Sequence, residues 1–325
     1  MLLHILERPH RLQTISVPVP LPAAGQVRIR VGCVGICGSD LEVFTGQREA
    51  PKRLSHPVIG HEVSGVVDRV GDHVSGFVAG DQVSAVQTWG CLTDFVLARP
   101  AHMLKLPPTM DLREGCLMEA MPGVMMAAER TGINANSEVL IVGQGLSGLL
   151  LTRVVSLHGC RRLVVVDPDP VKLDLAEQFG AQATVALKSD VGADELRKLY
   201  PDGFHVAIIA TPGSDAINHI VPLMRERGRI VFYGGLQSEA QLDLYAMHRK
   251  NISLIKEGMF VTGVRETRRL WQQALQLTID GRLPLERLRT HVFPMDRAQE
   301  AFELRADSDA HSIHVVLVNK WVDNA

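Results

Sequence analysis

The chain has 325 residues, of which 46% are hydrophobic and 22% are charged, and its formal net charge is −2. This length suits two domains, and the hydrophobic content excludes a disordered chain. Because the charge is nearly balanced and the basic residues are scattered, neither nucleic acid nor a membrane is expected as a partner. The five cysteines include no Cys-x-x-Cys pair, so a reducing, cytoplasmic environment is expected rather than a disulfide framework.

The region up to about residue 105 has the pattern of short β-strands. Apolar and polar residues alternate in the first run, and β-branched residues dominate two later runs. These strands are expected at residues 27–31, 63–70 and 82–86. Gly-Asp pairs between them mark turns, and the spacing predicts a small barrel or sandwich. Apolar residues then recur at helical spacing from Leu112 to Arg130, which predicts a helix.

From residue 138 onward, continuous apolar strands alternate with helices. Such strands are expected at residues 139–142, 163–167, 205–210 and 229–233. The alternation predicts a parallel, doubly wound sheet covered on both faces. Two helices and a last strand follow, at residues 265–280, 296–305 and 314–318.

The last strand is most simply an added strand of the first domain. The expected fold class is therefore α/β, with a β-rich domain interrupted by a doubly wound domain. Residues 1–115 and 261–325 are assigned to the β-rich domain, and residues 116–260 to the doubly wound one.

A glycine-rich turn, Gly143-x-Gly145-x-x-Gly148, follows the first strand of the doubly wound domain and opens a helix. Gly143 permits a tight turn, Gly145 lets the backbone approach a pyrophosphate, and Gly148 lets the helix pack on the sheet. The start of the helix, at Leu146 and Ser147, offers unpaired N–H groups to phosphates. The turn therefore predicts a dinucleotide site, the alternative being a tight turn without a ligand.

Asp167 ends the next strand, 19 residues after Gly148. An acid at this place can bind both ribose hydroxyls of NAD and would repel the extra phosphate of NADP. The sequence therefore favours NAD. The alternative is a carboxylate that caps the turn at residues 168–170.

Two further clusters, at residues 35–40 and 60–62, precede this turn. Together with Gly65, Gly71 and Val74, the second cluster is similar, position for position, to the signature of zinc alcohol dehydrogenases. Over nearly its whole length the chain resembles a zinc-containing medium-chain dehydrogenase/reductase, most closely the sorbitol and polyol dehydrogenase branch. The resemblance implies a GroES-like catalytic domain, a Rossmann cofactor domain and a homo-oligomer, either dimer or tetramer.

By this resemblance, Cys37 and His61 are the first two ligands of a catalytic zinc, and Glu119 is the candidate third ligand. Glu62 corresponds to an acid that lies beside the metal and exchanges with water, so either Glu62 or Glu119 could be the resting third ligand. One thiolate, one imidazole and one carboxylate leave a fourth tetrahedral position for water or substrate. Asp40 matches the acid that orients the ligand histidine.

The chain also departs from the family pattern. Only Cys91 lies where family members often carry four cysteines, so one zinc per chain and no structural zinc are expected. The resemblance gives Ser39 a hydrogen bond to the substrate oxygen. Glu42 occupies the position of a histidine that is common in the proton relay. Near the third ligand, Ala120 and Met126 replace the usual proline and histidine.

These features predict a zinc-dependent enzyme that transfers a hydride between a small-molecule secondary alcohol and NAD. The expected substrate classes are polyols, sugars, cyclitols and amino alcohols. Phe44 and Trp89 are candidate pocket residues, although both could equally be packing aromatics. Two alternatives stay open: a zinc-free quinone or enone reductase of the same superfamily, and a non-catalytic relative.

Overall fold

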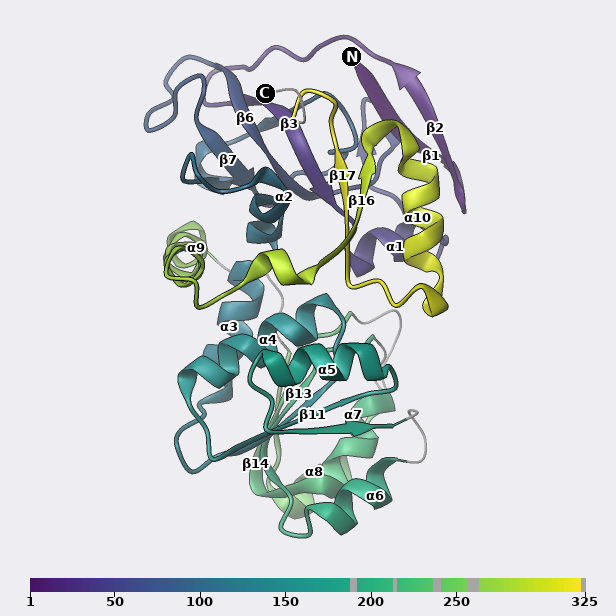
Figure 1. Ribbon diagram of the computed structural model, residues 1–325, viewed down its shortest axis with the longest axis vertical. Helices are drawn as coiled ribbons and strands as arrows, with labels where there is room; N and C mark the ends of the chain where they lie inside the picture. Colours follow the sequence, from purple (N-terminus) through teal and green to yellow (C-terminus); the bar gives the residue numbers. More distant parts are fainter. Residues whose placement is uncertain (188–191, 213–214, 236–240, 257–262, 323–325) are drawn as a thin grey trace. The chain divides into compact units, whose positions relative to one another are not determined.

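The computed structural model describes residues 1–187, 192–212, 215–235, 241–256 and 263–322. The chain forms two compact units, the first from Met1–Pro122 with Gly263–Ala325 and the second from Gly123–Thr262. In Figure 1 the yellow C-terminal elements accompany the purple and blue N-terminal strands in the first unit. Among the described residues, no helix is both long and apolar enough to cross a bilayer.

A seven-stranded sheet is the centre of the first unit. Its strands follow the order β16-β17-β3-β6-β7-β9, and β8 pairs with β3. Their bounds are β3 Val27–Gly35, β6 Glu62–Val70, β7 Gln82–Ala85, β8 Phe95–Ala98, β9 Met103–Lys105, β16 Arg289–Pro294 and β17 His314–Val318. The predicted last strand, β17, pairs in parallel with β16 and antiparallel with β3, so it does join the first sheet.

The remaining elements of the first unit surround this sheet. Two small sheets pair β1 Leu2–Arg8 with β2 Arg11–Ser16, and β4 Lys52–Arg53 with β5 His56–Pro57. The helices are α1 Gly38–Phe44, α2 Leu112–Gly115, α9 Val264–Ile279 and α10 Ala298–Ala306. Short 3-10 helices lie at η1 Pro100–His102, η2 Cys116–Glu119, η5 Leu285–Leu288, η6 Met295–Arg297 and η7 Ser308–Ala310. One apolar core joins the inner face of the sheet to α1 and α10.

The stretch from Leu112 to Arg130 is helical, as its spacing predicts, but it is not one continuous helix. The chain instead forms α2, then η2, and then α3 Met121–Thr131. Pro122 accounts for the restart, because proline lacks the N–H that a helix interior needs and is tolerated only in the first turn.

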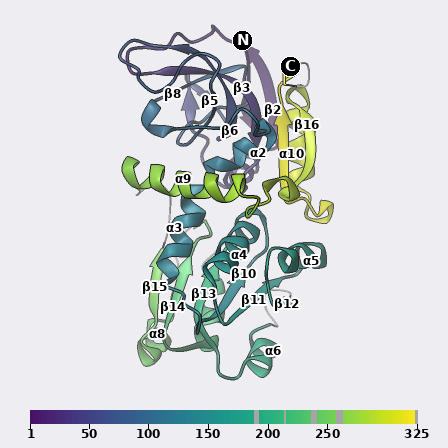
Figure 2. The same ribbon diagram turned by 60° about the vertical axis from the view of Figure 1, so that its left-hand side comes forward.

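The second unit contains a six-stranded parallel sheet in the order β12-β11-β10-β13-β14-β15. The strands are β10 Glu138–Val142, β11 Arg162–Asp167, β12 Ala183–Ala186, β13 Phe204–Ile209, β14 Met224–Phe232 and β15 Ser253–Lys256. The helices are α3, α4 Leu146–His158, α5 Pro170–Gln178, α6 Gly192–Leu199, α7 Asp215–Ile220 and α8 Leu244–Lys250, with η3 Val221–Leu223. Figure 2 shows α5 beside β12.

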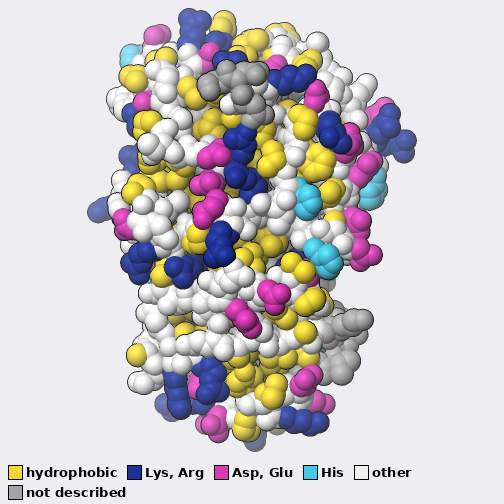
Figure 3. All heavy atoms as spheres, viewed as in Figure 1, with side chains coloured by type: hydrophobic (Ala, Val, Ile, Leu, Met, Phe, Trp, Pro, Cys, Tyr) yellow, Lys and Arg dark blue, Asp and Glu magenta, His cyan; other side chains and the backbone are white. Residues whose placement is uncertain are grey.

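The predicted α/β fold class is therefore confirmed. The strand order of the second unit reverses between β10 and β13, and this switch point is where doubly wound sheets bind their ligands. The glycine turn lies there, directly after β10. Lys and Arg side chains are interspersed with Asp and Glu on the face shown in Figure 3, in keeping with the net charge of −2.

Gly148, in the first turn of α4, is required for the helix to pack against the glycine turn. A Cβ added at Gly148 would lie only 1.9 Å from the carbonyl oxygen of Gly143, whereas one at Gly145 would meet nothing within 4 Å. Gly148→Ala should therefore destabilise the protein by about 1–3 kcal/mol, as overpacking does. The matched Gly145→Ala should cost less than about 1 kcal/mol. Thermal unfolding followed by circular dichroism measures both, and equal midpoints would contradict this close contact.

Candidate active site

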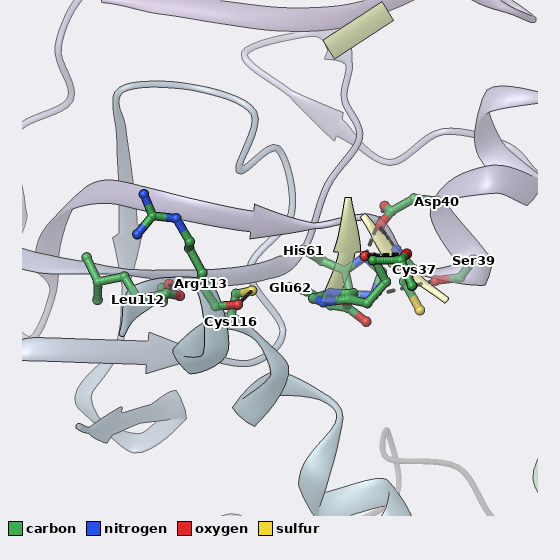
Figure 4. Close-up of polar contacts among 11 residues, drawn as sticks. Cys37, Ser39, Asp40, His61, Glu62, Leu112, Arg113 and Cys116 are labelled. Carbon is green, nitrogen blue, oxygen red and sulfur yellow. Dashed lines mark hydrogen bonds and ion pairs between the residues drawn. The ribbon is translucent and has the colours of Figure 1, made fainter. Parts of the chain in front are cut away.

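The carboxylate of Asp40 joins two segments that lie more than 20 residues apart in the sequence. Cys37 is the N-cap of α1, and its N–H donates to Oδ2 of Asp40 at 3.1 Å. Oδ1 of Asp40 accepts from the N–H of Gly60 at 2.9 Å and lies 3.0 Å from Nδ1 of His61. Asp40 is fully buried, so these contacts are shielded from water. Figure 4 shows Cys37 and His61 side by side beneath it.

His61 presents its other ring nitrogen, Nε2, away from Asp40. Ser39 places its hydroxyl oxygen 3.5 Å from Nε2, and the thiol of Cys37 hydrogen-bonds to the same side chain. Burial lowers the pKa of His61, but the charge and hydrogen bond of Asp40, with the Cys37 contact, raise it well above its usual range. The ring of Trp89 covers the imidazole, with 4.4 Å between ring centroids.

Glu62, the first residue of β6, forms a buried pair with His314, the first residue of β17. Oε2 of Glu62 lies 3.0 Å from Nε2 of His314, and both side chains are fully buried. Gly35 makes room for the pair, since a Cβ there would lie 2.2 Å from Oε2 of Glu62.

One oxygen of this carboxylate remains available. Burial raises the pKa of Glu62, but the hydrogen bond and charge of His314 outweigh that effect and lower it. Glu62 is therefore held as a carboxylate. Its Oε1 is buried and has no hydrogen-bond partner by distance and angle among the described residues, although the thiol of Cys37 is close enough to the carboxyl to lower its pKa further. An ionised, buried and unpartnered oxygen is what a cation site provides.

Glu119 ends η2, and its side chain is also buried. The indole of Trp271 donates to the carbonyl of Met118, which fixes η2 beneath α9. Burial raises the pKa of Glu119 to about 8, although the charge of His61 lowers it. Glu119 is thus close enough to His61 for their charges to interact.

The proposed zinc ligands are only partly assembled. Cys37 and His61 are in contact, but across the described ranges no three His, Cys, Asp or Glu side chains converge closely enough to chelate a metal ion. The chemical character of the donors still fits zinc, because a thiol, an imidazole and two buried carboxyls share this region. Glu119 is mostly protonated at neutral pH, so little charge draws it toward the other two.

Three other residues were selected from the sequence as candidates for the site: Glu42, Phe44 and Trp89. Glu42 is one turn beyond Ser39 on α1, half-buried, and its carboxylate makes no hydrogen bond within the described part of the chain. Phe44 is fully buried against Phe302, with 5.1 Å between ring centroids. Trp89 therefore faces the candidate site, whereas Phe44 belongs to the core.

His314 is the residue that sequence reasoning missed. It was read only as the first position of a strand, yet it is the partner of Glu62. The one available signal was a single ionisable residue opening an otherwise apolar run. Nothing in the sequence specifies a contact between residues 252 positions apart.

The glycine turn of the second unit has the form predicted for a phosphate site. Gly145 is the N-cap of α4 and supplies no side-chain hydrogen bond to the helix. The N–H groups at the start of an α-helix have no partner within it, so those of Leu146 and Ser147 are available to a phosphate. Because Gly145 has no Cβ, a ligand can approach its backbone closely.

Asp167 holds this turn in place. Its Oδ2 accepts from the N–H of Gln144 at 2.6 Å, and its Oδ1 accepts from the N–H of Asp169 at 2.9 Å. The turn-capping role weighed for this carboxylate is therefore present. Each oxygen keeps a second lone pair that can accept from a ribose hydroxyl.

Two family models match the chain. Residues 23–121 match the alcohol dehydrogenase GroES-like domain, and residues 148–279 match the zinc-binding dehydrogenase domain. The chain is 26% identical to the sorbitol dehydrogenase of Bombyx mori, with 94% of the chain and 95% of the relative covered. It is also 26% identical to the L-idonate 5-dehydrogenase of Vitis vinifera, with 91% and 89% covered.

Solved structures have the same fold. An oxidoreductase/dehydrogenase of unknown specificity from Escherichia coli matches with a TM-score of 0.88 at 22% identity, over 98% of this chain and 99% of that one. An alcohol dehydrogenase from Escherichia coli CFT073, complexed with NADH, matches with a TM-score of 0.85 at 21% identity, over 98% and 99%. The first unit is thus GroES-like and the second is a Rossmann domain. The chain belongs to the zinc-containing alcohol dehydrogenase family of medium-chain dehydrogenases/reductases.

Proposed function

We propose that this protein is a zinc- and NAD-dependent dehydrogenase that oxidises a secondary alcohol of a polyol, sugar, cyclitol or amino alcohol. The observation that carries the proposal is the arrangement around Asp40. Asp40 holds Cys37 and His61 in contact with each other, and Nε2 of His61 points away from Asp40. The relatives named above are dehydrogenases of small hydroxylated molecules. All five cysteines are free thiols, which fits the expected cytoplasmic location.

Zinc would be held by Cys37, His61 and a carboxylate, either Glu119 or Glu62. Thiolate, imidazole and carboxylate are the donors that zinc prefers. Both carboxyls are buried, Oε1 of Glu62 makes no hydrogen bond among the described residues, and burial raises the pKa of Glu119, so a bound cation would stabilise either one in its ionised form. When bound, zinc polarises an alcohol oxygen and lowers the pKa of its hydroxyl group.

The protein's own residues would then move the proton. Ser39, half-buried beside Nε2 of His61, would hydrogen-bond the substrate hydroxyl and pass its proton on. Glu42, one turn later on α1, or water would receive it. Asp40 fixes the tautomer of His61 by its contact with Nδ1, so that Nε2 is the free nitrogen.

NAD would be held at the glycine turn of the second unit. The N–H groups at the start of α4 would bind its pyrophosphate, and Asp167 would accept from the ribose hydroxyls. When bound, the cofactor would supply the hydride acceptor.

The zinc assignment predicts about one zinc per chain in the purified protein, measured by elemental analysis. Cys37→Ser and His61→Ala should lose it, and Asp40→Asn should weaken zinc affinity about 10- to 100-fold, as loss of a ligand's supporting acid does. Cys160→Ser removes a half-buried thiol of the second unit and should leave the zinc content unchanged. Two tightly bound zinc ions would contradict the assignment. A fully active, zinc-free preparation would favour the quinone or enone reductase.

The proton relay is tested at Glu42. If its carboxylate receives the proton, Glu42→Gln should change the dependence of kcat on pH and lower kcat about tenfold, since water replaces a positioned base only in part. Affinity for NAD should stay the same. Glu49→Gln, an exposed acid just beyond the same helix, is the control. If the pH dependence of kcat is the same for the wild type and Glu42→Gln, Glu42 is not the proton acceptor and water takes that role.

Cofactor choice is tested at Asp167. The wild-type protein should prefer NAD, because the carboxylate would repel the 2′-phosphate of NADP. Asp167→Asn keeps an acceptor for the amide of Gln144 but removes the charge, so the ratio of kcat/KM for NAD to that for NADP should fall about tenfold, equivalent to about 1.4 kcal/mol. Wild-type turnover that is faster with NADP would refute this role.

A further inference from the structure

Arg305 lies near the end of α10 and is half-buried. Its Nε is buried, and across the described residues its guanidinium makes no hydrogen bond or ion pair. Burial lowers the pKa of Arg305, although the charges of Cys37 and Glu62 act in the opposite direction. At the other end of the same helix, the exposed Arg297 pairs with Glu300.

The position of α10 places this guanidinium beside the candidate active site. The helix packs against α1, which Cys37 caps, and against β17, which begins at His314. Phe302 anchors it by its contact with Phe44. Arg305 follows Phe302 by three residues and so shares its face of the helix.

Arg305 is not simply the counter-ion of Glu62. The two side chains are near enough for their charges to interact, yet Oε1 of Glu62 and Nε of Arg305 are each buried without a partner. An unpaired buried donor is costly, and its persistence beside a site points to a ligand that satisfies it. The planar guanidinium matches carboxylate and phosphate oxygens in a two-point contact.

We infer that Arg305 binds an anionic group, a carboxylate or a phosphate, of the substrate that is oxidised at the Cys37–His61 site. The substrate is then a hydroxy acid or the phosphate ester of a sugar alcohol rather than a neutral polyol. This inference rests on the proposed function and narrows its substrate class.

The dinucleotide is a weaker source for this anion. Its pyrophosphate has its own donors at the start of α4, in the second unit. Arg305 is electrostatically coupled to Cys37 and Glu62, the groups beside which the reacting hydroxyl would lie.

The test compares pairs of ligands in which one member carries an anionic group that the other lacks. Sorbitol is paired with gluconate, galactitol with galactonate, and sorbitol also with sorbitol 6-phosphate. Binding of each to the zinc-loaded protein with NADH is measured by calorimetry, and oxidation by NADH formation. The variants are Arg305→Met, Arg305→Lys and the control Arg297→Met, which removes the exposed arginine at the N-cap of α10.

In the wild-type protein at least one anionic member should bind more tightly than its neutral partner. Arg305→Met should weaken that ligand about 10- to 100-fold, the range for hydrogen bonds to charged groups, and should reduce the preference over the neutral partner by the same factor. Arg305→Lys should retain only part of the affinity for that anionic ligand, because lysine cannot make the two-point contact. Arg297→Met should stay within about twofold of wild type.

Three outcomes would overturn the inference. One is a wild-type protein that binds no anionic member better than its neutral partner. Another is an Arg305→Met variant that loses neutral and anionic ligands equally, with a lower unfolding midpoint, which would make Arg305 structural. The third is a loss of NADH affinity alone, which would assign the arginine to the cofactor.

Failure of the proposed function would look different. In that case no member of the panel would be oxidised and no zinc would be bound. Oxidation of neutral polyols without a preference for anions would instead leave the proposed function intact and remove only the role of Arg305.

Discussion

A single buried carboxylate, that of Asp40, organises the candidate active-site region of this protein. Asp40 accepts from the backbone of Cys37 and of Gly60 and contacts the ring of His61. Burying a charge is expensive unless it is hydrogen-bonded on all sides, and these three partners offset that cost. The same contacts fix the start of α1, the approach to β6 and the orientation of the imidazole. Loss of this carboxylate would therefore disturb both ligand-bearing segments at once.

Around Asp40, the protein treats its other buried carboxyls in opposite ways. His314 holds Glu62 in the ionised form, whereas Glu119 has no such partner and its pKa rises to about 8. Neighbouring carboxyls with separated pKa values can take different roles in one site. A divalent cation would favour the ionised form of both. Its arrival would therefore change the charge of Glu119 more than that of Glu62.

Much of the architecture could be predicted because it follows from local patterns. The strands of the second unit are continuous apolar runs, and the glycine turn after β10 has a fixed spacing. Cys37 and Asp40 in one short cluster, and His61 in another, were found through the family resemblance of these two motifs. The structure confirms the fold class and shows the contacts among these three residues.

What could not be predicted depends on contacts made over long distances. His314 reaches Glu62 only because β17 pairs with β3, and Arg305 reaches the same region only because α10 packs on α1. Phe44 could not be separated from a pocket residue until its contact with Phe302 was known. The break between η2 and α3 is explained by Pro122, which is a local signal. The helical spacing of the apolar residues on both sides of Pro122 made this signal easy to overlook.

The first unit is assembled from both ends of the chain, and this has a consequence for biosynthesis. The second unit is contiguous, so it can fold while the ribosome is still translating, as domains generally do. The sheet of the first unit stays incomplete until β17 has emerged and paired with β3. Until then Glu62 lacks its partner His314. The contiguous second unit can therefore fold before β17 is made, whereas the candidate site of the first unit is complete only once β17 has paired with β3.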